Sequence, residues 1–164
     1  MKLKIQLYQF TCANCSHKFQ APVYPFFDMS YGEFILRTTE SNRLIYLNAN
    51  HDEAFLEASR ILDEINQVKK LFDHQKFDPF QEIVHVAYDP DKWGHYYKIG
   101  IDPHCPNCGA NESKCFQATN PPEYKVMDIP VASSVLWKTL SSEEKKERIE
   151  LELDKFFKND VTKK

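Results

Sequence analysis

Glycine is scarce in this chain, and long apolar runs are missing altogether. Only 4 of the 164 residues are glycine, which leaves little room for glycine-rich phosphate loops or flexible linkers. No apolar run reaches the roughly 18 residues of a membrane-spanning helix, and residues 1–10 lack the apolar core of a signal peptide. The sequence therefore predicts one domain over residues 1–164, located in the cytoplasm and without a membrane partner.

A strong charge of one sign is also missing. The formal net charge is −3, with eleven acidic against six basic side chains over residues 51–104 and five basic against three acidic over residues 1–50. Proteins that bind nucleic acid usually present a basic face. The acidic middle therefore disfavours a nucleic-acid partner and favours another protein, of basic character.

Cysteine is present, and its spacing is the most informative feature of the chain. Four of the five cysteines form two Cys-x-x-Cys pairs, Cys12/Cys15 and Cys105/Cys108. One tight turn supplies two thiolates to a cation, and a second turn completes a tetrahedral set at about 2.3 Å from zinc. Cytosolic thiols stay reduced, so such pairs hold metal more often than they form disulfides. The pairs predict a structural Zn²⁺ site, with iron as the less favoured metal.

The sequence around each pair resembles the knuckles of zinc ribbons and rubredoxins. Cys105-Pro-Asn-Cys108-Gly109 is especially similar to the second rubredoxin knuckle, and Cys12-Ala-Asn-Cys15-Ser16 is a looser match to the first. The resemblance covers about 30 residues. It implies a strand–turn–strand knuckle at residues 8–23 and another at 96–118. The long segment between the pairs departs from the compact ribbon pattern.

Other residues near the pairs allow further interpretations. Cys115 is expected to be a small buried apolar residue. His17 and His104 flank the knuckles, where a histidine either replaces a ligand or donates to a cysteine sulfur, although a surface histidine is the more ordinary interpretation. A thioredoxin-like dithiol at Cys105 is disfavoured, because Gly109 and the polar residues after it make a poor helix start.

Steps of three and four residues between apolar side chains predict two main helices. The first covers residues 52–73, with Asn50 or Asp52 as its cap. The second covers residues 142–158 and opens on a Ser-x-x-Glu capping box at 141–144.

Period-two alternation and turn signals predict the strands of a mostly antiparallel sheet. Together with the helices, which should pack on this sheet, they predict an α+β fold with split zinc-ribbon knuckles. Strands are predicted at residues 3–8, 18–23, 33–38, 43–48, 82–88, 96–101 and 114–118, a short helix at 131–140, and a frayed tail at 159–164.

One cluster of titratable residues permits an enzymatic interpretation. His85, Asp89, Asp91 and His95 lie close together in the sequence, and such a set could be the catalytic metal ligands of a nuclease resembling His-Asn-His endonucleases. Against this, His85 alternates with valines in a predicted strand, and Asp-Pro-Asp is ordinary turn chemistry. The sequence therefore predicts a protein that is not an enzyme.

Two aromatic-dense stretches, at residues 24–31 and 88–97, are mixed with acidic rather than basic side chains. Tyrosine and tryptophan are enriched at the hot spots of protein interfaces. We therefore expect a small non-enzymatic protein-binding protein, of the immunity type that inhibits a toxin. The alternatives are a zinc-ribbon protein that binds nucleic acid or has a regulatory role, and a rubredoxin-like electron carrier.

Overall fold

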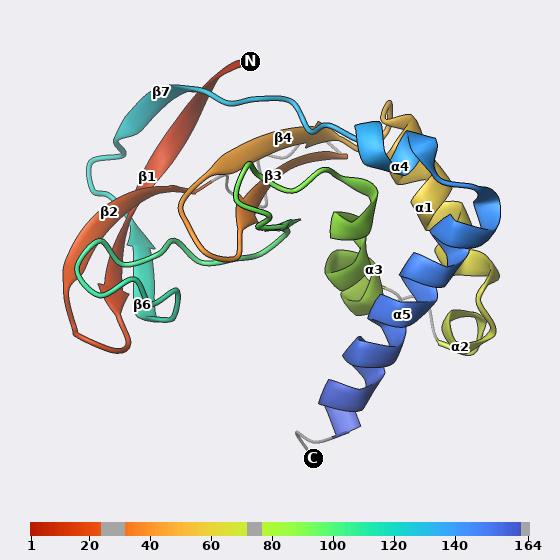
Figure 1. Cartoon of the computed structure of the whole chain (residues 1–164). Coiled ribbons are helices and arrows are strands. Elements are labelled where there is room, and N and C mark those ends of the chain that lie inside the picture. Colours follow the sequence, from red (N-terminus) through yellow and green to blue (C-terminus); the bar gives the residue numbers. More distant parts are fainter. Residues whose placement is uncertain (24–31, 72–76, 162–164) are drawn as a thin grey trace.

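The computed structural model describes residues 1–23, 32–71 and 77–161 (Figure 1). In chain order its strands are β1 (Lys2–Cys12), β2 (Lys18–Val23), β3 (Glu33–Thr38), β4 (Leu44–Asn48), β5 (Tyr97–Lys98), β6 (Ser113–Ala118) and β7 (Tyr124–Asp128). Its helices are α1 (Glu53–Glu64), α2 (Asn66–Lys69), α3 (Phe77–Ile83), the 3₁₀ helix η2 (Val84–Ala87), α4 (Val135–Thr139) and α5 (Ser142–Val161). Antiparallel strands and separate helices confirm the α+β class.

The long strand β1 is the centre of the first sheet. β2 pairs with one edge of β1, and β6 and β7 follow one another along the opposite edge. The change of partner occurs at Leu7, whose N–H donates to the Glu123 carbonyl at 2.8 Å and whose carbonyl accepts from the Thr119 N–H at 3.3 Å. The first strand thus joins residues 113–128 to the N-terminal segment in one sheet.

The second sheet consists of the β3–β4 hairpin and the two-residue strand β5. The hairpin occupies the residues predicted for it from the sequence. Ile5 of β1 packs against Leu44 and Tyr46 of β4 and against Ile129 in a small apolar cluster. This cluster joins the two sheets.

A larger apolar core lies between the hairpin and the helices. β3 and β4 contribute Leu36 and Leu47, while α4 and α5 contribute Trp137, Ile149 and Leu153. Burying each such side chain contributes about 1.5–3 kcal/mol. The helices therefore pack on the β3–β4 sheet, whereas the cysteine knuckles belong to the other sheet (Figure 1). None of the described helices is long and apolar enough to cross a bilayer.

The helix predicted over 52–73 is two helices in the structure. Asp52 caps α1 as predicted, with its carboxylate accepting from the Phe55 N–H at 2.8 Å. The helix ends because Ile65 takes an extended conformation (φ −73°, ψ 129°), and α2 follows. Ile65 and Val68 nevertheless stay buried. The apolar spacing thus predicted which side chains are buried, but not that the backbone breaks; residues 72 and 73 lie outside the described chain.

The strand predicted over 82–88 is wrong. This segment is the end of α3 followed by η2. Val84, His85 and Ala87 are all buried, because the segment is packed between α1 and the rest of the helical layer. The alternating apolar residues therefore belong to a helical turn that is covered on more than one side. Such a turn gives the same period-two pattern as a strand, so the pattern alone does not separate the two.

Other predicted elements are shorter than expected or were missed. The strand at 96–101 forms only over the two residues of β5, and the helix at 131–140 forms only over α4. The edge strand β7 was not predicted, because its exposed side chains give no buried face. The box at the start of α5 is confirmed: the Ser141 N–H donates to the Glu144 carboxylate at 2.7 Å, and the Glu144 N–H donates back to Ser141 Oγ at 3.2 Å.

Glu57 of α1 contacts side chains of α4 and α5, so its removal should destabilise the fold. The buried Trp137 indole N–H donates to Glu57 at 2.8 Å, and Lys145 Nζ lies 2.9 Å from both carboxylate oxygens. Glu57→Ala leaves that N–H without an acceptor, so we expect a loss of about 2 kcal/mol in the free energy of urea unfolding. Glu64→Ala, at the exposed end of α1, should change it by less than about 0.5 kcal/mol. Equal values for the two variants would contradict the proposed role of Glu57.

Candidate metal centre

The four cysteines of the two pairs meet at one end of the β1-centred sheet. Cys12 ends β1 and Cys15 lies in the turn to β2, while Cys105 and Cys108 lie in the turn that precedes β6. All four Sγ atoms lie within 4.8 Å of one another. Within residues 1–23, 32–71 and 77–161 this is the only group of three or more His, Cys, Asp or Glu side chains placed to hold a metal ion.

The sulfur separations fit a single tetrahedral ion. Cys12 Sγ and Cys108 Sγ are 3.6 Å apart, and so are Cys15 Sγ and Cys105 Sγ. Four sulfurs at about 2.3 Å from a tetrahedral zinc lie about 3.8 Å from one another. A disulfide would need about 2.05 Å. The donor set therefore suits a closed tetrathiolate site, with Cys12 and Cys105 buried, Cys15 half-buried and Cys108 exposed.

Pairing between β1 and β6 explains why such distant segments meet. The antiparallel register places Cys12 opposite Ser113, after a shift in register at the end of β1. Beyond that pair, the Ala13 N–H donates to the Glu112 carbonyl at 2.9 Å. The sheet itself therefore brings the two knuckles to the same end, where an ion would join them.

The two knuckles have the same backbone hydrogen bonds. The Ser16 N–H donates to the Cys12 carbonyl at 3.1 Å, and the Gly109 N–H donates to the Cys105 carbonyl at 2.8 Å. A second bond, from the N–H of each first cysteine to the carbonyl two residues beyond the second cysteine, recurs at 3.0 and 2.8 Å. Ser16 and Gly109 also share positive φ angles of 58° and 76°. This repetition supports the knuckle resemblance in both halves.

The positive φ at equivalent positions predicts opposite effects of two substitutions. Ser16→Gly should raise the free energy of unfolding by about 0.5–1 kcal/mol, because glycine adopts this conformation without strain. Gly109→Ala should lower it by about 1 kcal/mol; a Cβ there would meet no atom within 4 Å, so only backbone strain acts. Chemical denaturation of metal-loaded protein measures both. A destabilised Ser16→Gly variant would show that the Ser16 side chain matters more than its backbone.

Hydrogen-bond donors surround the sulfurs. The Asn107 side-chain amide, 3.5 Å from Cys15 Sγ, lowers the pKa of Cys15 to about 6, with help from the His17 N–H. Burial raises the pKa of Cys105 to about 11, although the N–H groups of Asn107 and Cys108 oppose this. Such donors stabilise thiolate charge and orient the ligands. Sequence reasoning missed Asn107, whose place inside the second turn was the available signal.

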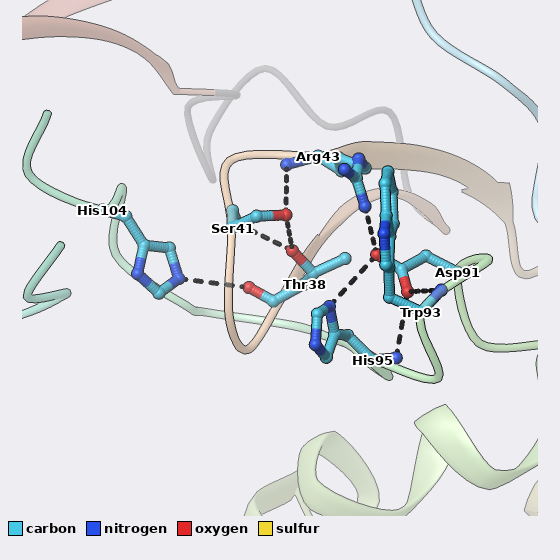
Figure 2. A network of polar contacts seen from close by, with 7 residues as sticks. All are labelled: Thr38, Ser41, Arg43, Asp91, Trp93, His95 and His104. Atoms are coloured by element: carbon cyan, nitrogen blue, oxygen red, sulfur yellow. Dashed lines mark hydrogen bonds and ion pairs between the residues drawn. The ribbon is translucent and has the colours of Figure 1, made fainter.

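His104 anchors the second knuckle to the β3–β4 turn and lies outside the ligand group. Its N–H donates to Asn42 Oδ1 at 2.7 Å, and the Asn42 amide donates back to the His104 carbonyl at 2.9 Å. Its ring nitrogens lie 2.9 Å from the Gly109 carbonyl and 3.4 Å from the Thr38 carbonyl (Figure 2). His104 therefore positions the knuckle.

Two other candidates lie beside the centre without joining the ligand group. Cys115 is exposed on β6, so the expectation of a buried residue is wrong; it lies on an outer strand that nothing in the described chain covers. The His17 ring stacks on Phe19, with ring centroids 6.3 Å apart.

The structure does not bring His85, Asp89, Asp91 and His95 together as a ligand set. His85 is buried with Nε2 3.9 Å from Glu152. Asp89 accepts hydrogen bonds from two N–H groups at the start of α4, at 2.9 and 3.0 Å. Asp91 and His95 alone remain neighbours, 3.3 Å apart. Each residue thus has a structural contact of its own.

The aromatic residues divide into buried and exposed groups. Tyr88 is buried, and its hydroxyl donates to Asp52 at 3.0 Å; burial and this neighbour raise the pKa of Tyr88 well above its usual range. Trp93 and Tyr96 are exposed. The aromatic stretch at residues 24–31 lies outside the described chain.

Comparisons with known proteins leave the knuckle geometry as the only family evidence. No family model matches the chain, and searches of curated proteins and of solved structures also gave no match. What the coordinates support is therefore the coarser statement: a four-cysteine cluster, consistent with a zinc-ribbon-like metal site, within an α+β fold.

Proposed function

We propose that Cys12, Cys15, Cys105 and Cys108 hold one structural Zn²⁺, and that the fold stabilised in this way binds another protein. The observation that carries the first part is the convergence of four thiols within 4.8 Å of one another. Four protein ligands leave no open coordination position for a substrate, which supports a structural rather than a catalytic ion. Zinc is preferred over iron because a closed tetrahedral set of four thiolates is a typical structural zinc site.

Metal analysis tests the first part. Protein purified under reducing conditions should contain one zinc per chain and be colourless. Cys108→Ser should lower the zinc content, whereas Cys115→Ser, outside the cluster, should leave it unchanged. A coloured protein with one iron per chain would instead support a rubredoxin-like electron carrier, and a folded protein without metal would contradict the site.

The exposed face of α1 supports a basic protein partner. Glu53, Asp63 and Glu64 are exposed there, beside Leu56, which is 44% exposed. Their spacing places all four on one side of the helix, with Arg60 as the one basic residue among them. Charge complementarity accelerates association and selects partners. These features agree with an immunity-type protein that neutralises a basic toxin or nuclease.

Charge reversal on α1 tests this partner. Wild-type protein immobilised on a resin and incubated with an extract of its native host should retain a basic protein. An immobilised Asp63→Lys/Glu64→Lys variant should not retain it. The purified partner should bind the variant at least about tenfold more weakly at low salt. Glu150→Lys/Asp154→Lys on the outer side of α5 is the matched control. Equal binding to both variants, or no retained protein, would contradict the proposal.

Two exposed aromatic residues and a lysine on the first sheet favour a second candidate, nucleic-acid binding. Phe116 and Tyr124 are 58% and 52% exposed, and Lys4 Nζ lies 4.7 Å from the Tyr124 ring. Exposed aromatic side chains on a sheet stack with unpaired bases. Titration with single- and double-stranded oligonucleotides at two salt concentrations decides: the absence of binding at low salt would eliminate this candidate.

A further inference from the structure

Trp93, in the loop between η2 and β5, has two cations over its indole ring. The Arg43 guanidinium carbon lies 3.3 Å from the ring centroid and Lys92 Nζ lies 4.1 Å from it. Both distances are within the range of a cation–π interaction. Figure 2 shows the ring edge-on with Arg43 against one side.

Asp91 holds this arrangement in place. Its Oδ1 accepts from the N–H groups of Trp93 and His95 at 2.9 and 3.0 Å, and its Oδ2 forms an ion pair with Arg43 and lies 3.3 Å from the His95 ring. Burial alone would raise the pKa of Asp91, but these donors together lower it to about 2. The carboxylate is thus charged at neutral pH and already saturated with donors.

The surface that results presents donors and positive charge. The Asp91 side chain is only 3% exposed, whereas Arg43 is 41% and Trp93 53% exposed. Lys92 is exposed as well. The Asp91 carboxylate is therefore covered by its donors, whereas Trp93, Arg43 and Lys92 are accessible to solvent.

We propose that this cation–tryptophan clamp, formed by Arg43, Trp93 and Lys92, is a docking surface for an acidic segment of a partner protein. Carboxylates match its exposed guanidinium and ammonium groups, and Trp and Arg are the residue types that dominate interface hot spots. The clamp lies at the opposite end of β4 from the acidic face of α1 (Figure 1), so it is a second surface and does not depend on the proposed basic partner.

A protein segment fits the clamp better than a nucleic acid. A base would have to stack on the indole, where the Arg43 guanidinium and the Lys92 ammonium already lie 3.3 and 4.1 Å from the ring centroid. The negative net charge of the chain, −3, also opposes a polyanion. A carboxylate-bearing peptide needs only the two cations, which are exposed.

Hydrogen bonds connect the clamp to the second knuckle of the metal centre. Arg43 lies at the end of the β3–β4 turn, which Asn42 ties to His104 of the second knuckle at 2.7 and 2.9 Å. The same turn is linked to the loop after Trp93, because the Thr39 N–H donates to the Tyr96 carbonyl at 3.1 Å. A bound ion therefore pre-organises the surface, which reduces the entropy lost on binding.

The test follows the indole N–H signals of full-length, metal-loaded protein labelled with ¹⁵N. The chain has two tryptophans, and Trp93→Phe identifies the signal of Trp93 against that of the buried Trp137. A peptide of about a dozen alternating Glu and Ala residues, an acidic probe, should shift the Trp93 signal alone. The same peptide with Gln in place of Glu should produce no shift.

Variants then identify the groups responsible. Arg43→Gln and Lys92→Gln should each weaken the acidic peptide about fivefold, the effect of losing one exposed charge pair. Arg60→Gln and Lys69→Gln, on α1 and α2, should not change the affinity. Lys92 is exposed, so its variant remains informative if Arg43→Gln alters the hairpin.

Three outcomes would overturn the proposal. They are an unmoved Trp93 signal at millimolar acidic peptide, an equal shift with the Gln peptide, and a thymidine oligonucleotide of the same length that shifts the signal at lower concentration. None of these outcomes bears on the α1 charge-reversal experiment or on the zinc content.

Discussion

Removing the metal with a strong chelator under reducing conditions is expected to lower the free energy of unfolding by about 5 kcal/mol or more. The ion would tie residues 12–15 to residues 105–108, and closing so long a loop removes much entropy from the unfolded chain. Without it, Cys12 and Cys105 remain as buried thiols with no metal ion to bind. Because whole domains are stable by only about 5–15 kcal/mol, thermal melting should show a large decrease that added zinc reverses.

Removal of the metal should destabilise the two knuckles before the helical core. Amide hydrogen exchange should accelerate first at the knuckle N–H groups of Ala13 and Gly109, which are bonded within and between the two turns. Amides of α5 near Ile149 and Leu153 should stay protected longer, because their core does not include the knuckles. Cys105→Ser should reproduce the effect of chelation, and Cys115→Ser should melt like wild type. A chelator effect below about 1 kcal/mol would rule out a stabilising metal site.

Arg37→Met is expected to lower the free energy of unfolding by about 3 kcal/mol. Arg37 lies on β3, is 6% exposed, and joins three separate segments. Its guanidinium donates to the Ile101 carbonyl at 3.2 Å, to Asn42 Oδ1 at 3.1 Å and to the Pro22 carbonyl at 3.0 Å. Methionine would fill the space but leave the Ile101 and Pro22 carbonyls without this donor, whereas Asn42 Oδ1 keeps the His104 N–H. Urea unfolding of metal-loaded protein measures the loss.

Because Arg37 is charged, its control variants must separate the loss of charge from the loss of hydrogen bonds. Burial lowers the pKa of Arg37 to about 10, and nearby Asp102 opposes this shift, so the side chain stays protonated at neutral pH. Arg37→Lys keeps the charge, but one ammonium cannot satisfy three acceptors in a fixed fork, so we expect a loss of about 2 kcal/mol. Arg60→Met, on the exposed face of α1, should change stability by less than about 0.5 kcal/mol. Equal effects of Arg37→Met and Arg60→Met would contradict this role.

The cysteine ligands were predictable because the information is local. Two thiols three residues apart in a tight turn reach one ion whatever the rest of the chain does. The Asp52 cap and the box of Ser141 with Glu144 were predictable for the same reason, since each side chain bonds a backbone group three residues away.

Elements whose conformation depends on distant packing were not predictable. Ile65 ends α1 although its neighbours continue the apolar spacing, and residues 82–88 form helical turns although they alternate like a strand. In both places the periodicity correctly indicated burial. Which backbone conformation buries those side chains was decided by the elements packed against them.

The sequence by itself determined the four metal-ligand candidates, the α+β class and the capped N-terminal ends of α1 and α5, because these follow from contacts within a few residues. Only the tertiary structure placed His104 on the β3–β4 turn, gave Arg37 its three acceptors and positioned Arg43 and Lys92 over the ring of Trp93. Arg43 and Trp93 are 50 residues apart in the chain. Contacts over such separations depend on how strands and loops are stacked in space, and no local pattern in a single sequence records that stacking.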